Sequence, residues 1–157
     1  MDECKTVLNT GLRGVTIAST KISDVNGAEG KLVYRGYLAK DLANTATFEE
    51  IVHLLLYERL PDKEELAELK EILKKEVAVP DDVMKSLALS PADALPMDVL
   101  QAAVMMLAQH DPDVQEYSKE AATRMGVRLI AKLPTIVAAW DRIRNGKQPL
   151  APLPDLG

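Results

Sequence analysis

The chain offers few side chains of the kinds that perform acid–base or nucleophilic chemistry. It contains two histidines, His53 and His110, and a single cysteine, Cys4. Neither histidine belongs to a metal-ligand pattern such as His-x-x-x-His or Cys-x-x-Cys. His53 falls inside an apolar helical stretch and His110 near a helix end, so we expect both to have structural roles. A catalytic thiol needs a lowered pKa, and no histidine stands near Cys4 in the sequence to provide one.

Two basic motifs could contact an anion. Arg124, Arg128 and Lys132 recur at four-residue steps, which places them on one face of a helix. We favour a solvated face over an anion-binding stripe for these three residues. Arg35 stands in the motif Tyr34-Arg-Gly-Tyr37. An anion-facing arginine is one interpretation, and an arginine that ties a hairpin to the helices is the one we prefer.

The paired acidic residues fit helix starts better than catalytic dyads. Glu49-Glu50, Glu64-Glu65 and Asp81-Asp82 all fall in the first turns of expected helices, where the helix dipole favours carboxylates. The glycines form neither a Gly-x-Gly-x-x-Gly motif nor a P-loop. We therefore assign no catalytic, cofactor-binding or metal-binding residue, and we expect no cofactor.

The totals limit the classes of partner. A length of 157 residues fits one domain, and the formal charge of −5 argues against a nucleic-acid partner. No run of 18 or more apolar residues occurs, so we expect no membrane span and no membrane partner. The first residues, Met1–Lys5, lack the apolar core of a secretory signal, and a lone cysteine fits a reducing compartment. We expect a cytoplasmic protein.

The segment 120–144 is the element around which the chain is organised. Its apolar residues follow the i, i+3, i+4, i+7 spacing of one helical face. They are Leu129, Ile130, Leu133, Ile136, Val137, Trp140 and Ile143. Pro134 removes the amide that would bond to the Ile130 carbonyl, so a bend is expected there. Ala131, Ala138 and Ala139 are small enough to let a neighbouring helix approach closely.

The amino-terminal part, residues 1–37, predicts a small β appendage. Short strands are expected at Gly14–Ala18, Thr20–Asp24 and Lys31–Tyr34. Asn26-Gly27, between the second and third of these, is a strong local hairpin signal.

Residues 38–146 predict a helical part, so the fold is expected to be mainly α. Besides the segment 120–144, the expected helices cover residues 39–43, 49–58, 63–78, 82–89 and 96–109. Thr47 with Glu50, and Asp62 with Glu65, form capping boxes, and Asp81 is expected to cap the helix after it. Residues 147–157 contain three prolines and predict an extended tail.

Several motifs together resemble the start of bacterial and archaeal citrate synthases. They are Gly11-Leu-Arg-Gly-Val15, Ile22-Ser-Asp24, Gly30-Lys-Leu-Val-Tyr-Arg-Gly-Tyr37, Asp41-Leu-Ala43, Phe48-Glu-Glu50, Leu60-Pro61, Pro96-Met-Asp-Val-Leu100, Asp111-Pro-Asp113, Ile130-Ala-Lys-Leu-Pro-Thr-Ile136, Asn145-Gly146 and Pro152-Leu-Pro-Asp-Leu156. The 2-methylcitrate synthases share them. One departure is visible, because the family commonly has His-Pro-Met where this chain has Leu95-Pro96-Met97.

This resemblance implies a multi-helical large-domain fragment of an enzyme that condenses acetyl-CoA with oxaloacetate to citrate and works as a homodimer. In such enzymes a carboxylate removes an acetyl proton while histidines assist. Those groups lie beyond the matched segment, so the resemblance transfers no catalytic residue to this chain. Helices 96–109 and 120–144 resemble the pair that meets its twofold copy.

Two hypotheses follow from the resemblance. The first is an amino-terminal part of a citrate-synthase-like acyltransferase, expected to be inactive alone and to associate with the missing carboxy-terminal catalytic portion. The second is a non-catalytic helical association module derived from citrate synthase.

Overall fold

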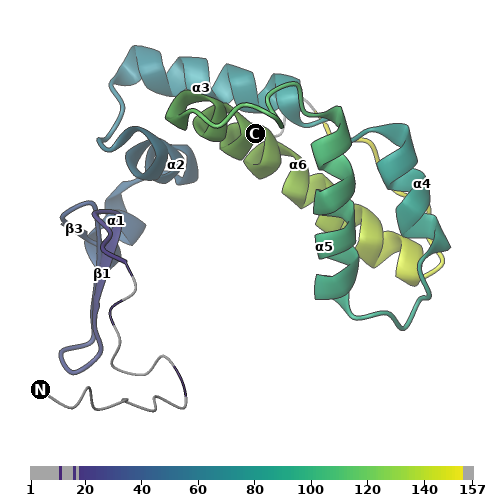
Figure 1. Ribbon diagram of the computed structural model, residues 1–157, viewed down its shortest axis with the longest axis horizontal. Coiled ribbons are helices and arrows are strands. Elements are labelled where there is room, and N and C mark those ends of the chain that lie inside the picture. Colours follow the sequence, from purple (N-terminus) through teal and green to yellow (C-terminus); the bar gives the residue numbers. More distant parts are fainter. Residues whose placement is uncertain (1–10, 12–15, 17, 154–157) are drawn as a thin grey trace, which may run out of the picture.

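The protein is mostly helical, as the sequence predicts. The computed structural model describes residue 11, residue 16 and residues 18–153. Within these residues there are six α-helices and a small three-stranded antiparallel sheet. The sheet lies at one end of the molecule beside α1, and the long helix α6 runs past α3, α4 and α5 (Figure 1). No helix among the described residues is both long enough and apolar enough to pass through a membrane.

The predicted helices all form, with ends that differ by a few residues. The helical segments are α1 (Ala39–Thr45), α2 (Phe48–Tyr57), α3 (Lys63–Glu76), α4 (Asp81–Leu89), α5 (Pro96–Leu107), the 3-10 turn η1 (Ala108–His110) and α6 (Lys119–Arg144). The largest differences are of two residues, at the ends of α1, α3 and α5. Helix α1 continues two residues beyond its expected end, whereas α3 and α5 stop two residues before theirs, and after α5 the chain tightens into η1.

The sheet joins β1 (Ser23–Asn26), β2 (Lys31–Tyr34) and β3 (Tyr37–Leu38) in the order β1-β2-β3. The predicted strand Lys31–Tyr34 is confirmed. The strand predicted at Thr20–Asp24 is wrong in its bounds, because β1 begins at Ser23 and continues to Asn26, which still pairs with Lys31. The strand predicted at Gly14–Ala18 lies largely outside the described residues.

The two hairpins of this sheet use different turns. Between β1 and β2, Gly30 has φ +65°, and the Asn26 side chain accepts a hydrogen bond from the Glu29 amide at 3.2 Å. Asn26-Gly27 is therefore not the centre of a two-residue turn. Between β2 and β3, Arg35 and Gly36 have φ of 47° and 91°, which is the left-handed pair that a type I′ turn requires.

Side-chain caps start α2, α3 and α6, and the sequence predicts the first two of these. Thr47 with Glu50 and Asp62 with Glu65 form both predicted capping boxes, and Ser118 caps α6 by accepting from the Ala121 amide. The prediction that Asp81 caps α4 is wrong. Pro80 occupies that position without a side-chain cap.

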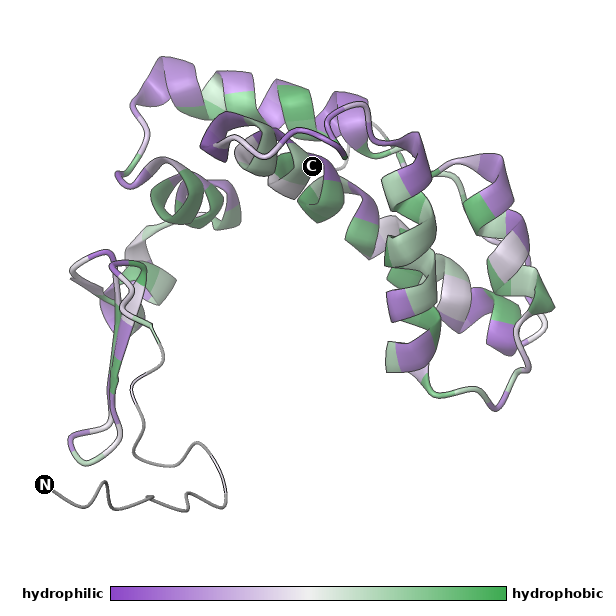
Figure 2. Cartoon of the chain, in the orientation of Figure 1, coloured by the Kyte–Doolittle hydropathy of each residue, from purple (hydrophilic) through white to green (hydrophobic). Residues whose placement is uncertain are grey.

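Two separate clusters of buried residues form the core. The larger joins α4, α5 and α6 through Val83, Leu87, Val99, Ala103, Leu107, Ile136, Ala139 and Trp140. The smaller joins α2, α3 and α6 through Val52, Leu69 and Val127. Much of α2 consists of hydrophobic residues, whereas α3 is mostly hydrophilic, as expected for a surface helix (Figure 2).

The buried side of α6 is mostly the expected one. Ile136 and Trp140 are buried, and so are Ala131 and Ala139, at 7% and 2%, because small side chains allow α6 to lie close to its neighbours. Val137 and Ala138 were expected on this side but are exposed, Val137 by 53%. The helix continues through Pro134. The tail then turns back at Gly146, and the Arg142 Nε donates to the Gln148 carbonyl at 2.5 Å.

Candidate functional site

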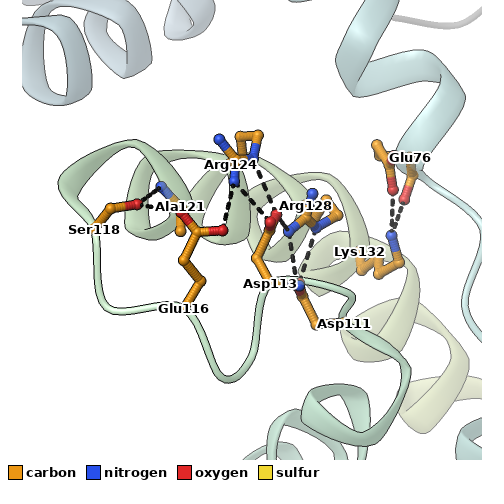
Figure 3. A network of polar contacts seen from close by, with 9 residues as sticks. All are labelled: Glu76, Asp111, Asp113, Glu116, Ser118, Ala121, Arg124, Arg128 and Lys132. Atoms are coloured by element: carbon orange, nitrogen blue, oxygen red, sulfur yellow. Dashed lines mark hydrogen bonds and ion pairs between the residues drawn. The ribbon is translucent and has the colours of Figure 1, made fainter.

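Three basic residues of α6, Arg124, Arg128 and Lys132, take part in the polar contacts drawn in Figure 3. Arg124 donates through Nε and Nη2 to the two carboxylate oxygens of Asp113, at 3.0 and 2.7 Å. Arg128 likewise donates through Nε and Nη2 to the two carboxylate oxygens of Asp111, at 2.8 and 2.7 Å, and its Nη2 also donates to Asp113. Such paired contacts match the fixed fork of the guanidinium group.

The third cation fastens a different element to α6. The Lys132 ammonium donates to the Glu76 backbone carbonyl at 2.7 Å and to its carboxylate at 2.9 Å. Glu76 is the last residue of α3, so this contact also satisfies a carbonyl at a helix end. The Lys132 side chain is only 14% exposed.

The electrostatics of this cluster favour its charged form. Hydrogen bonds from Arg124, and then from Arg128, hold the pKa of Asp113 well below its usual range. The hydrogen bond from Arg128 lowers the pKa of Asp111, and the same contact raises the pKa of Arg128. Acidic side chains therefore neutralise the cations, and little positive charge remains to attract an external anion.

The preferred interpretation of a solvated face is thus wrong for Arg128 and Lys132, whose side chains are mostly covered. Sequence reasoning missed the acidic partners. The signal for them in the sequence is the motif Asp111-Pro-Asp113, which places two carboxylates close together shortly before α6. The cluster holds the loop 111–118 and the end of α3 against α6.

Arg35 connects the sheet to the helices, as predicted. Its Nη2 donates to the Leu55 carbonyl at 3.3 Å and lies 3.7 Å from the Glu58 carboxylate. Its backbone amide donates to the Ile22 carbonyl at 2.8 Å. The side chain is 12% exposed, so it connects the turn between β2 and β3 to the end of α2 rather than facing solvent.

His53 has the structural role that the sequence predicts. It is 5% exposed, and its ring stacks on Tyr57 with centroids 4.6 Å apart. Its Nδ1 lies 2.8 Å from the Arg59 carbonyl, which makes it the donor of that hydrogen bond. The contact holds the turn after α2, where Glu58 has a left-handed backbone.

His110 pairs with an acidic residue on a neighbouring helix. Its Nε2 lies 2.9 Å from the Asp82 carboxylate, and this hydrogen bond lowers the pKa of Asp82. In some enzymes a histidine–aspartate pair activates a nucleophilic hydroxyl or thiol. Among the described residues, the His110 ring forms its hydrogen bond with Asp82, and no hydroxyl or thiol contacts it. We assign it to the contact between α4 and η1. Cys4 lies outside the described residues.

A pocket of about 330 Å³ opens beside the ion-pair cluster, between α5, α6 and the loop after η1. Its wall is mainly apolar, with Val104, Met105 and Leu129 among its residues. Arg128 and Lys132 reach its rim already paired with acids. The described residues contain no group of three or more potential metal ligands. The geometry around this pocket therefore supports a structural role for the polar residues.

A family model described as "Citrate synthase, C-terminal domain" matches residues 11–157. The chain belongs to the citrate synthase family. This confirms the resemblance drawn from the motifs, and the match runs through nearly the whole chain. The expectation that the segment comes from the amino-terminal part of such an enzyme stays a prediction.

Curated relatives carry two names. Citrate synthase 2 of Bacillus subtilis is 40% identical over 94% of this chain, and the 2-methylcitrate synthase of Shewanella oneidensis is 38% identical over 92%. These matches span only 39% and 38% of the relatives' own lengths. Identity at this level does not separate the two activities.

Solved structures of the family confirm the fold. The citrate synthase of Pyrobaculum aerophilum superimposes with a TM-score of 0.86 and 39% identity, over 93% of this chain and 39% of that one. The enzyme of Thermoplasma acidophilum, solved as a complex with carboxymethyl coenzyme A and oxaloacetate, gives a TM-score of 0.82 at 27% identity, over 91% and 38%. This citrate synthase segment therefore folds as the corresponding part of much longer relatives.

Proposed function

We propose that this segment is the amino-terminal, large-domain part of a citrate-synthase-type acyltransferase. In the complete enzyme, acetyl-CoA condenses with oxaloacetate to give citrate and CoA. One observation carries the proposal: the segment matches its relatives along almost all of its own length but spans about two-fifths of theirs. Its role is then to build the helical scaffold on which a catalytic segment is placed.

The 157-residue polypeptide is expected to be inactive by itself. Proton abstraction next to a thioester carbonyl needs a positioned base and a donor for the developing oxyanion. Among the described residues, both histidines and the α6 cations are engaged in contacts that hold elements together. None of these groups converges on a substrate-sized site with a free base.

A chimera tests the proposal directly. In Bacillus subtilis citrate synthase 2, the matched segment is replaced by residues 11–157 of this chain, and CoA release is measured with acetyl-CoA and oxaloacetate. We expect the chimera to be active and the isolated segment to give only background release. Propionyl-CoA is tested in parallel, because 2-methylcitrate carries one methyl group more than citrate.

Two results would contradict this function. Turnover by the isolated segment above a heat-inactivated control would place the chemistry within these residues. A chimera that is folded by circular dichroism but lacks activity would argue that the segment has diverged from a catalytic role.

A second candidate is an association module that keeps the helices of the family without the chemistry. The observation that favours it is the outward side of α5, where Met97 and Met105 are 63% and 73% exposed. Exposed methionines eight residues apart on one helix face are typical of a contact surface. In either case we propose a homodimer formed through α5 and α6. A cytoplasmic location stays a prediction.

A further inference from the structure

A polar pocket, separate from the one beside the ion-pair cluster, lies between α2 and α3, which pack against each other (Figure 1). Its volume is about 340 Å³. His53 and Tyr57 of α2 line it, and α3 contributes the apolar side chains of Leu69 and Ile72. This volume is in the range of small-molecule sites, so the polar groups that reach the pocket decide what it can hold.

The His53 ring presents a hydrogen-bond acceptor to this pocket. Its Nδ1 donates to the Arg59 carbonyl at 2.8 Å, so in the neutral ring Nδ1 carries the hydrogen and Nε2 keeps its lone pair. Nε2 has no hydrogen-bond partner among the described residues, and the side-chain nitrogens buried there without a partner are instead Arg35 Nε and Trp140 Nε1. Nε2 is therefore not sealed in the interior, although the residue as a whole is only 5% exposed. An acceptor held in this way suits a ligand that donates.

The pocket carries one uncompensated negative charge. The Glu65 carboxylate accepts twice from the Arg59 guanidinium, once at 2.8 Å, and also from the Asp62 amide at 2.9 Å. The hydrogen bond from Arg59 lowers the pKa of Glu65 to about 2, so both groups stay charged and their charges cancel. Glu68 also lines the pocket and is exposed, and no hydrogen bond or ion pair with a described residue engages its carboxylate. The charge that remains is that of Glu68.

These features select a ligand by its chemistry. An anion would be repelled by Glu68, and the guanidinium that could attract it is already paired with Glu65. A metal ion lacks a full ligand set, because the described residues contain no group of three or more potential metal ligands. A primary ammonium has one positive charge and three N–H donors, which suit one free carboxylate and the lone pair of His53. Its carbon chain can pack against Leu69 and Ile72.

We propose that the pocket between α2 and α3 binds a small aliphatic primary amine in its protonated form, and that the ammonium donates to Nε2 of His53 and to the carboxylate of Glu68. The site serves binding rather than acyl transfer, because Arg59, the cation that lines it, is paired with Glu65 and cannot serve a developing oxyanion. The pocket has no part in the proposed function, so the two proposals stand or fall independently.

Titration with n-butylammonium chloride tests the site. The 157-residue chain contains two histidines, so the ring Cε1–H signals of the untagged chain report on His53 by NMR, with His110 as an internal reference. At about pH 8 the alkylamine is protonated, and we expect it to shift the His53 signal saturably while the His110 signal stays in place. A dissociation constant of about 1–10 mM is expected for so small a ligand. n-Butanol, which has no charge, and tetramethylammonium, which has no N–H, should each bind about tenfold more weakly or worse.

Glu68→Gln measures the contribution of the free carboxylate. It keeps the size of an exposed side chain on α3 and removes one charge, so the helix should stay folded, as checked by circular dichroism. We expect about tenfold weaker binding of butylammonium. Glu71→Gln is the matched control, because Glu71 is an exposed glutamate of the same helix that does not border the pocket. It removes the same charge and should change the dissociation constant by less than about twofold.

His53→Asn removes the acceptor alone. Its side-chain amide takes the place of Nδ1 and can still donate to the Arg59 carbonyl, but nothing replaces Nε2. We expect about fivefold weaker binding or more, followed through the backbone amide signals of α2 and α3 because the ring signal is lost. If this variant does not fold, the comparison of Glu68→Gln with Glu71→Gln decides the question.

Each outcome counts for or against the site. A saturable shift of the His53 signal that Glu68→Gln weakens and Glu71→Gln does not would support it. No shift at about 50 mM butylammonium, several times the expected dissociation constant, would overturn it. Equal binding of tetramethylammonium, or equal weakening by both glutamate variants, would reduce the effect to a general attraction of cations and overturn it as well. A response to Zn²⁺ without one to butylammonium would assign the pocket to a metal ion and contradict the proposal.

Discussion

At the scale of single residues, Trp140 combines the largest side chain of the core with an unmet polar group. It is 5% exposed in the larger cluster, and its indole Nε1 is buried with no hydrogen-bond partner among the described residues. Arg144 lies over the ring at 5.8 Å from its centroid. A buried donor without a partner costs about 1–3 kcal/mol, which offsets part of the gain from burying the ring.

Trp140→Phe is therefore expected to change the free energy of unfolding by less than about 1 kcal/mol, because it removes the unmet donor together with some apolar area. Trp140→Ala should cost about 3–5 kcal/mol through the cavity it leaves. Urea unfolding followed at 222 nm measures both, since Trp140 is the only tryptophan and both variants lose its fluorescence. Equal losses for the two variants would contradict the argument.

The residue scale also shows where sequence reasoning reaches its limit. The roles of His53 and Arg35 were predicted correctly, because burial on an apolar helix and a position next to a hairpin are local properties. The partners of Arg128 and Lys132 were missed. Glu76 lies 56 residues before Lys132, and a helical period cannot indicate which distant acid comes to face a cation.

At the scale of elements, the turn between β2 and β3 depends on left-handed backbone at Arg35 and Gly36. A Cβ added at Gly36 would meet no atom within 4 Å, so any effect of a side chain there comes from the backbone alone. The same holds for the space around Gly27, which lies in the other hairpin and has no positive φ. Gly27 is therefore a matched control for a substitution at Gly36, because the two sites differ in backbone conformation but not in free space.

Gly36→Ala is expected to destabilise the protein by about 1 kcal/mol, because alanine is strained at positive φ. Gly27→Ala should be neutral or stabilising by a few tenths, because alanine restricts the unfolded chain. Thermal unfolding by circular dichroism compares them, with a lower Tm for Gly36→Ala only. A similar loss of Tm in both variants would show that the turn geometry is not the cause.

Element positions followed well from the sequence because their causes are local. The capping boxes at Thr47 and Asp62 fixed the starts of α2 and α3, and Pro96 at the first position fixed the start of α5. The inward face of α6 followed less completely. Val137 was expected inside because it is hydrophobic and Ala138 because it is small, but both are exposed, since the covered side of α6 depends on which helices lie nearby.

At the scale of the whole molecule, the exposed side of α5 leads to a prediction about assembly. We expect the chain to self-associate at micromolar concentration, because Met97 and Met105 leave apolar surface on a helix that is well packed on its other side. Met105→Asp should weaken the dimer about tenfold or more, as measured by sedimentation equilibrium. Leu89→Asp is the control, because Leu89 is 85% exposed but belongs to α4. A monomer at every concentration would contradict the prediction.

The position of α6 in both clusters has a consequence for how the molecule comes apart. Val127 near one end belongs to the smaller cluster, whereas Ile136, Ala139 and Trp140 near the other belong to the larger. Pro134 lies between these two sets and leaves one backbone bond of the helix unmade. The missing helix hydrogen bond thus lies between two halves of α6 that pack in different clusters. Amides on either side of it should exchange with deuterium as two groups, each at the pace of its own cluster.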